Sequence, residues 1–273
     1  MEGETLSSRS SAARLVRTLA LHFVSIGSLS MRRALAFIGG VVLLSVIAVR
    51  AAEAPKVTVV NKGFPGRNSR DALRLMDTEI IALKPQHVVV YFGMNDAMNS
   101  GNLLPLADYE AHLRTMVKKL TDSGVKSVAL VTINPVIEEY VRARHPKHPQ
   151  KENLQACLAS YDQAVRKVAG ENALPLIDLR QLVEKNGGSV ISDTCLIRCE
   201  KNGGGKDGVH LTPAAYLLLG QRAFEVVGGR VKGGDTVVCF GDSITFGAGV
   251  KGAGTVAGET YPAALQRCFD QRK

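Results

Sequence analysis

Short apolar runs alternate along this chain with longer amphipathic segments. The apolar runs are rich in β-branched residues and lie at 57–60, 87–92, 125–132, 173–179 and 236–240. Runs of this length and composition are typical of buried strands, whereas the segments between them carry apolar residues at helical spacing. Alternating strands and helices predict an α/β fold, a doubly wound, flavodoxin-like parallel sheet of about five strands in a three-layer α/β/α arrangement.

Capping residues bound the expected helices. Asn68 or Ser69 is a suitable N-cap for a helix to about Leu83, and Asp108 caps one that ends before Gly124. Further helices are expected at 151–169, 213–227 and 261–269, with a short one after residue 180. The basic stretch 142–149 is either a solvated loop or a wall of a site, and the solvated loop is the simpler interpretation.

Four polar motifs lie at the ends of predicted strands or next to a predicted helix. They are Gly241-Asp242-Ser243, Gly63-Phe64-Pro65-Gly66, Gly93-Met94-Asn95-Asp96 and Asp207-Gly208-Val209-His210. Ligands of open α/β sheets bind outside the carboxyl ends of the strands, so these motifs are expected to meet there. Each has a plainer interpretation, as a turn glycine, a capping residue or a surface histidine. Their combination in one α/β chain favours a catalytic site.

The four motifs resemble those of the SGNH (GDSL-type) hydrolase superfamily, which includes lysophospholipases and acyl esterases, over the region from Val57 to the C-terminus. The resemblance implies a catalytic triad and an oxyanion hole, and it implies no metal and no cofactor. The triad would be Ser243, His210 and Asp207. The oxyanion hole would use the backbone N–H groups of Ser243 and Gly66 and the amide of Asn95, with Asp242 and Gly93 supporting.

The order of the motifs departs from the family's pattern. In the family the serine motif comes first, whereas here Ser243 follows His210. We therefore expect a circularly permuted chain, in which the glycine-rich segment 228–234 joins the family's usual ends. Unrelated Ser-His-Asp enzymes have different chain orders, so the permutation leaves the chemistry possible.

The resemblance implies a hydrolase of carboxylic esters, with acetyl or other acyl groups on carbohydrate or lipid. Two alternatives stay open at this point: an acyltransferase that uses the same residues, and a non-catalytic carbohydrate-binding module. The expected partner is therefore a small-molecule, polysaccharide or lipid ester. The net charge of +9 is scattered, which argues against nucleic acid as a partner.

The first 54 residues have the features of a targeting segment. Met31-Arg32-Arg33 is basic, residues 34–49 are apolar, and Ala52-Glu53-Ala54 has the form of a cleavage site. We expect cleavage after Ala54 and export to the periplasm or medium, with residues 1–54 as signal peptide and extension and 55–273 as a single hydrolase domain. An uncleaved anchor would be the one contact with a membrane. Met31 is an alternative start, with residues 1–30 as an added extension.

Export would place the five cysteines in an oxidising compartment. Because their number is odd, at least one stays unpaired. Cys195 and Cys199 are the expected local pair. Cys239 and Cys268 are interpreted as small buried apolar residues.

Overall fold

The computed structural model describes residues 55–272. The predicted signal segment and its cleavage site lie outside this range, so cleavage and export stay predictions. These described residues lie within one compact unit. No helix within the described range is both long and apolar enough to cross a membrane.

The centre of the fold is a parallel five-stranded sheet. Its strands are β1 (Thr58–Gly63), β2 (His87–Tyr91), β3 (Ser127–Val131), β4 (Leu176–Ile177) and β5 (Thr236–Gly241), in the order β1-β5-β2-β3-β4. Every residue of β2 is buried, and so are five of the six residues of β5. This burial explains the continuous apolar runs. The expected fold class is confirmed, although β4 pairs with β3 through only two residues.

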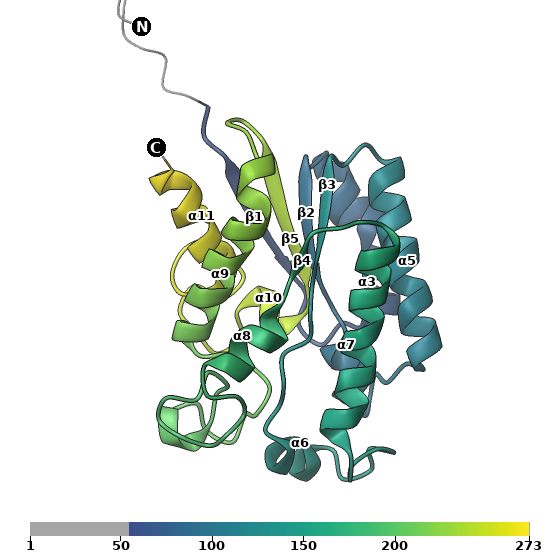
Figure 1. The fold of residues 1–273 in the computed structure, drawn as a ribbon, viewed down its shortest axis with the longest axis vertical. Helices are drawn as coiled ribbons and strands as arrows, with labels where there is room; N and C mark the ends of the chain where they lie inside the picture. Colours follow the sequence, from purple (N-terminus) through teal and green to yellow (C-terminus); the bar gives the residue numbers. More distant parts are fainter. Residues whose placement is uncertain (1–54, 273) are drawn as a thin grey trace, which may run out of the picture. The chain divides into compact units, whose positions relative to one another are not determined.

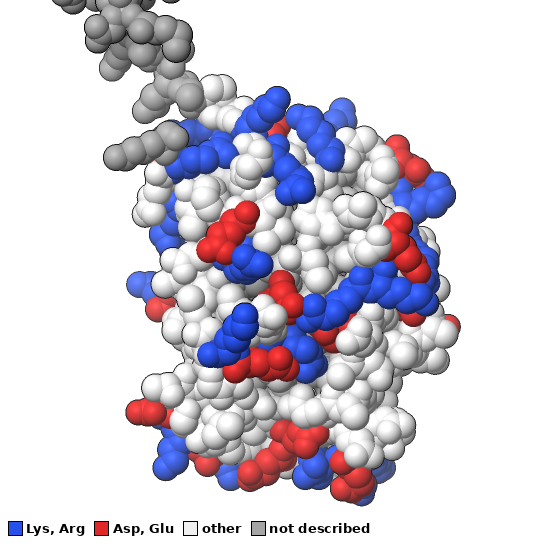
Figure 2. Space-filling model, viewed as in Figure 1, with Lys and Arg blue, Asp and Glu red and all other residues white. Residues whose placement is uncertain are grey.

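Helices cover both faces of the sheet (Figure 1). One face carries α3 (Ser69–Leu75), α5 (Leu106–Asp122) and α7 (Leu154–Glu171), and the other carries α9 (Pro213–Val227) and α11 (Tyr261–Gln271). Shorter helices lie in the connections: α4 (Met94–Met98), α6 (Glu138–Arg144), α8 (Leu179–Lys185) and α10 (Ser243–Phe246). In Figure 2, basic and acidic side chains are intermixed over much of the face in view. No single sign of charge dominates there to steer a charged ligand.

Three local predictions differ from the structure. The helix expected to reach Leu83 is α-helical only to Leu75 and continues as a π-helix over Met76–Ile80 and a 3-10 turn over Ile81–Leu83. Met76 and Ile80 are fully buried, so tertiary packing holds them against the core although the hydrogen-bond ladder is wider there. Helix α5 begins at Leu106 after Pro105, which places Asp108 in the first turn instead of at the cap.

The third difference concerns the basic stretch 142–149. Its first three residues belong to α6 instead of a loop. Glu138 and Arg142 form an i,i+4 ion pair at 3.7 Å on this helix, an interaction that favours helical structure. The solvated-loop interpretation was therefore wrong for the start of the stretch.

Strand β5, last in the chain, lies between β1 and β2. Counted as the first strand, it gives the order 2-1-3-4-5 of flavodoxin-like sheets. Helix α11 contacts β1, because the Gln266 side chain accepts from the N–H of Val59 at 2.7 Å and donates to the carbonyl of Val57 at 3.0 Å. The circular permutation itself stays a prediction.

Candidate active site

Ser243 begins the short helix α10 directly beyond the end of β5. The turn is tight because two glycines let backbone pack on backbone. A Cβ on Gly241 would lie 2.1 Å from Thr245 Oγ1, and one on Gly63 would lie 2.0 Å from the nitrogen of Phe246. Only glycine fits at either position. The sequence Gly-Asp-Ser therefore holds Ser243 at the carboxyl edge of the sheet.

Asp242 lies beneath this turn and is completely buried. Its carboxylate accepts from the N–H of Ile244 at 2.8 Å and from Asn95 Nδ2 at 3.2 Å. Burial raises the pKa of Asp242 from 3.8 to about 7, against the opposing effect of the Ile244 hydrogen bond and of His210. Asp242 thus caps α10 and links it to α4.

His210 connects Ser243 to Asp207. The ring Nε2 lies 2.9 Å from Ser243 Oγ, and Nδ1 lies 3.0 and 2.9 Å from the two carboxylate oxygens of Asp207. An ionised carboxylate can only accept, so Nδ1 carries the proton and Nε2 is free to accept one from the serine. The three side chains form a continuous series from acid to base to hydroxyl.

The Asp207 carboxylate is also held by the backbone. Its Oδ1 accepts from the N–H groups of Val209 at 2.9 Å and His210 at 2.8 Å. Burial alone would raise the pKa of Asp207, but the hydrogen bonds and charge of His210, with the Val209 N–H, outweigh it and hold that pKa well below its usual range. Asp207 therefore stays ionised at neutral pH.

A cavity of about 370 Å³ opens over Ser243. Gly66 lines it in a left-handed conformation (φ +75°), with open space where a Cβ would point. Among the described residues, no acceptor is paired with the backbone N–H of Gly66 or of Ser243. Two unpaired donors beside a hydroxyl can bind a developing oxyanion. The structure thus brings Gly66, Asn95, His210 and Ser243 to one cavity.

Asn95 lies in the first turn of α4, which begins after Gly93 at φ +127°. A Cβ on Gly93 would lie 2.5 Å from the side chain of Ile133, so this turn also requires glycine. The Asn95 amide nitrogen is already engaged, donating to the carbonyl of Arg67 at 3.0 Å and to Asp242. To act as the expected oxyanion donor, this amide must leave one of these two partners.

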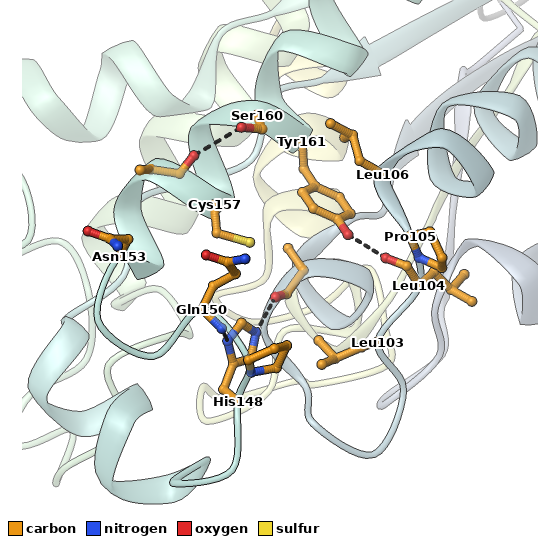
Figure 3. Close-up of a pocket in the computed structure, with 13 residues that line it drawn as sticks. Leu103, Leu104, Pro105, Leu106, His148, Gln150, Asn153, Cys157, Ser160 and Tyr161 are labelled. Atoms are coloured by element: carbon orange, nitrogen blue, oxygen red, sulfur yellow. Dashed lines mark hydrogen bonds between the residues drawn. The ribbon is translucent and has the colours of Figure 1, made fainter.

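A second, larger cavity of about 700 Å³ lies between residues 103–106 at the start of α5, residues 148–150 and α7 (Figure 3). His148 is fully engaged there, since Nδ1 accepts from the Gln150 N–H at 3.0 Å and Nε2 donates to the carbonyl of Ala97 at 2.7 Å. Burial raises the pKa of the Cys157 thiol, which keeps it a poor nucleophile. Among the described residues that line the larger cavity, no nucleophile is paired with a base, whereas the smaller cavity contains the contact between His210 and Ser243.

Two arginines at the site were not among the predicted site residues, although Arg144 belongs to the stretch 142–149, for which a wall of a site was the alternative interpretation. Arg144 lines the smaller cavity and donates to the carbonyls of Asp207 and Lys206. The Nε of Arg198 lies 3.8 Å from Asp207 Oδ2. Neither belongs to a motif, and the only signal in the sequence was the basic character of the stretch around Arg144.

The expected Cys195–Cys199 disulfide is not formed in the structure, where both thiols are free and buried. The two sulfurs donate to different backbone carbonyls, Cys195 to Gly188 at 3.7 Å and Cys199 to Ser192 at 3.3 Å. Cys239 is fully buried, as its interpretation as an apolar residue requires, whereas Cys268 is only half-buried.

The buried carboxyl group of Asp242 makes the stability of the fold depend on pH. Its pKa of about 7 exceeds the ordinary 3.8, so the folded protein retains a proton that the unfolded chain releases. Its contribution to the free energy of unfolding therefore falls as the pH rises from about 4 to 7, by on the order of 4 kcal/mol at most. Asp242→Asn cannot ionise, so its stability relative to wild type should increase from pH 5 to pH 8.

Urea unfolding of both proteins at several pH values measures this difference. Any mismatch between the new amide and Asn95 is present at every pH and cancels in the comparison. The carboxyl group of Asp96, whose pKa burial raises to about 6, titrates in both proteins. A stability difference that stays constant from pH 5 to pH 8 would mean that Asp242 does not change its charge in this range.

Known proteins are similar to this chain in sequence. An "Isoamyl acetate-hydrolyzing esterase 1 homolog" from Rattus norvegicus is 29% identical over 60% of this chain and 66% of its own length. The lipoprotein YqeF from Bacillus subtilis is 25% identical over 63% of this chain and 74% of its own length. An acetylxylan esterase from Geobacillus stearothermophilus is 27% identical over 45% of this chain and 54% of its own length. The chain thus spans about two thirds or less of both esterases.

A solved structure and a family model complete the comparison. The structure of a lipase/acylhydrolase from Enterococcus faecalis is 25% identical, with a TM-score of 0.48, over 62% of this chain and 74% of its own. The model of the GDSL-like lipase/acylhydrolase family matches residues 43–218, which is more than half of the chain and includes Gly66, Asn95, Asp207 and His210. The expected superfamily of carboxylic ester hydrolases is thereby confirmed, and the chain belongs to the GDSL-like lipase/acylhydrolase family.

Proposed function

We propose that this protein hydrolyses carboxylic esters with Ser243 as the nucleophile. The observation that carries the proposal is the series of contacts from Asp207 through His210 to Ser243, with 2.9 Å at each of the two steps. A serine hydroxyl is a weak nucleophile without an adjacent base, and here the base and the group that orients it are both in place.

In the proposed reaction, Ser243 Oγ attacks the ester carbonyl carbon while His210 Nε2 takes the hydroxyl proton. The oxygen of the tetrahedral intermediate accepts hydrogen bonds from the N–H groups of Ser243 and Gly66, and from Asn95 once its amide turns from the Arg67 carbonyl. His210 then protonates the leaving alcohol, and water repeats the sequence to release the acid. Asp207, held ionised, keeps the imidazole in the required tautomer and stabilises the imidazolium.

The substrate we propose is an ester with a short acyl group. The catalytic cavity holds about 370 Å³ and is lined on its apolar side by Pro65, Met94, Met98, Val209 and Ala248. This volume lies at the lower end of the range for small-molecule sites. Two of the relatives are named for acetyl esters, of isoamyl alcohol and of xylan, which supports an acetyl or similar group here.

A series of nitrophenyl esters from acetate to palmitate tests this proposal. We expect kcat/KM to be highest for acetate to butyrate and to fall with longer chains. A maximum at palmitate would contradict a short-acyl substrate while leaving ester hydrolysis intact. Analysis of the products with an added alcohol distinguishes hydrolysis, which releases the free acid, from transfer to the alcohol.

Replacing Asn95 with alanine tests the third oxyanion donor. We expect kcat to fall by about two to three orders of magnitude with little change in KM, because the donor acts mainly in the transition state. Asn186, at the end of α8, is exposed, so Asn186→Ala is a matched control that should keep wild-type kinetics. A rise in KM at unchanged kcat would instead assign Asn95 to substrate binding.

A further inference from the structure

Arg198 lies beside the loop that carries Asp207 and His210. Its backbone N–H donates to the carbonyl of His210 at 2.8 Å, and its carbonyl accepts from the N–H of Gly208 at 2.9 Å. The neighbouring residue Ile197 forms an antiparallel bridge with Leu211. The segment around Arg198 is therefore hydrogen-bonded to the turn from Asp207 to His210 at two positions, Gly208 and His210.

The side chain of Arg198 extends from this segment to the serine loop, which comprises α10 and the residues that follow it as far as Gly249. One guanidinium nitrogen, Nη1, donates to the carbonyl of Gly249 at 2.6 Å, and Nε lies 3.8 Å from Asp207 Oδ2. The Nε atom is buried and has no hydrogen-bond partner among the described residues. A Cβ on Gly249 would lie 2.6 Å from Arg198 Cζ, so the guanidinium packs directly on the glycine backbone.

Gly249 is in turn connected to the nucleophile. The N–H of Ala248 donates to the carbonyl of Ser243 at 2.9 Å, which closes the loop after α10. Arg198 thus spans the two segments that carry the triad, whose serine and histidine are 33 residues apart in the chain. Because its side chain is only 22% exposed, its positive charge near Asp207 is incompletely screened by water.

We propose that Arg198 is a positioning residue that holds the Asp207–His210 loop against the serine loop and partly neutralises the charge that Asp207 presents to His210. The proposal rests on the triad of the proposed function. The proposed role of Arg198 has two parts, a contact and a charge, which experiments can distinguish. The contact with Gly249 sets the geometry of attack, and the charge sets the pH at which the imidazole becomes available.

The direction of the charge effect follows from the groups around the ring. His210 contacts Asp207, acts on the charge of Asp242 and lines the smaller cavity with Arg144 and His145. Two further groups, Arg198 and Tyr216, interact with Asp207. Removing the Arg198 charge leaves Asp207 less neutralised, which favours the imidazolium form of His210. The acidic limb of the pH profile of kcat/KM should then move to higher pH, because only neutral imidazole accepts the serine proton.

Two substitutions separate the effects. Arg198→Met removes both the charge and the contact, and should lower kcat about 10- to 100-fold and move the acidic limb upward by about half a unit to one unit. Arg198→Lys keeps the positive charge, but an ammonium group lacks the planar fork that lets arginine contact Gly249 and Asp207 together. It should therefore lower kcat and leave the acidic limb of the pH profile at the wild-type pH. Arg74, whose side chain is 72% exposed, provides the control variant Arg74→Met, which should match wild type.

The experiment measures kcat and KM on nitrophenyl acetate from pH 5 to pH 9, together with the NMR titration of the His210 ring, assigned with His210→Ala. The titration does not depend on turnover, so it tests the charge effect even if the wild type proves inactive and the proposed function fails. An unchanged His210 titration in Arg198→Met would overturn the charge effect. A wild-type kcat in both variants would overturn the positioning role. If Arg198→Met does not fold, the test rests on Arg198→Lys. An acidic limb of the kcat/KM profile at a different pH in Arg198→Lys than in wild type would then contradict the proposal.

Discussion

Replacing Ser243 with alanine is expected to lower kcat for ester hydrolysis by about four to six orders of magnitude, because it removes the nucleophile. His210→Ala should be about as damaging, since the hydroxyl then has no base within 2.9 Å. Residues that act as one unit lose function together, so the double variant should be little worse than either single one.

The fold should tolerate Ser243→Ala. The substitution keeps the backbone N–H and removes only an oxygen whose partner is His210. Ser160 provides a matched control, because it is an exposed serine that lines the larger cavity. Ser160→Ala should keep wild-type kinetics, and circular dichroism should show all three proteins folded. Activity above a few per cent of wild type in Ser243→Ala would exclude Ser243 as the nucleophile.

Asp207→Asn should lower kcat by about four orders of magnitude, as expected when the tautomer of a catalytic histidine is wrong. Asp207 Oδ1 accepts two backbone N–H groups, so the new amide must place its oxygen there. Its NH2 group then faces His210 Nδ1, in the place of the oxygen 2.9 Å away. Two donors that face each other are unfavourable, so we expect the ring to accept at Nδ1 and to carry its proton at Nε2, where it can no longer take the proton of Ser243.

Kinetics and nitrogen NMR of the imidazole together measure this effect. The NMR spectrum should show the proton on Nδ1 in the wild type and on Nε2 in Asp207→Asn. Asp207→Ala leaves both tautomers accessible and should therefore retain more activity than Asp207→Asn. Equal activity of Asp207→Asn and wild type would mean that another group orients the ring.

The sequence predicted much of the fold because its strands are buried on both faces. The runs at 87–92 and 236–240 coincide closely with β2 (His87–Tyr91) and β5 (Thr236–Gly241), both central in the sheet. At the sheet edge the prediction was poorer, since a strand was expected over residues 173–179 and only the two residues of β4 form one. The π-helix at Met76–Ile80 was not foreseeable, because packing overrides the local pattern there.

The site was predictable where a motif dictates a backbone shape. Gly-Asp-Ser builds the serine turn, and Asp207 and His210 lie on one turn because the carboxylate accepts the His210 N–H at 2.8 Å. Contacts between distant segments were not predictable. The contact of Arg198 with Gly249 joins residues 51 positions apart, and the engagement of Asn95 by Arg67 depends on how two loops pack. Such contacts leave no periodic signal in the chain.

The most direct measurement of the central claim is covalent labelling with a fluorophosphonate, which reacts with a serine activated by a base. The intact mass should increase by one adduct per chain, and peptide mapping should place it on Ser243. Labelling should be lost in Ser243→Ala, be greatly slowed in His210→Ala and be unchanged in Ser160→Ala. An unlabelled wild type, or an adduct on any residue other than Ser243, would contradict the account.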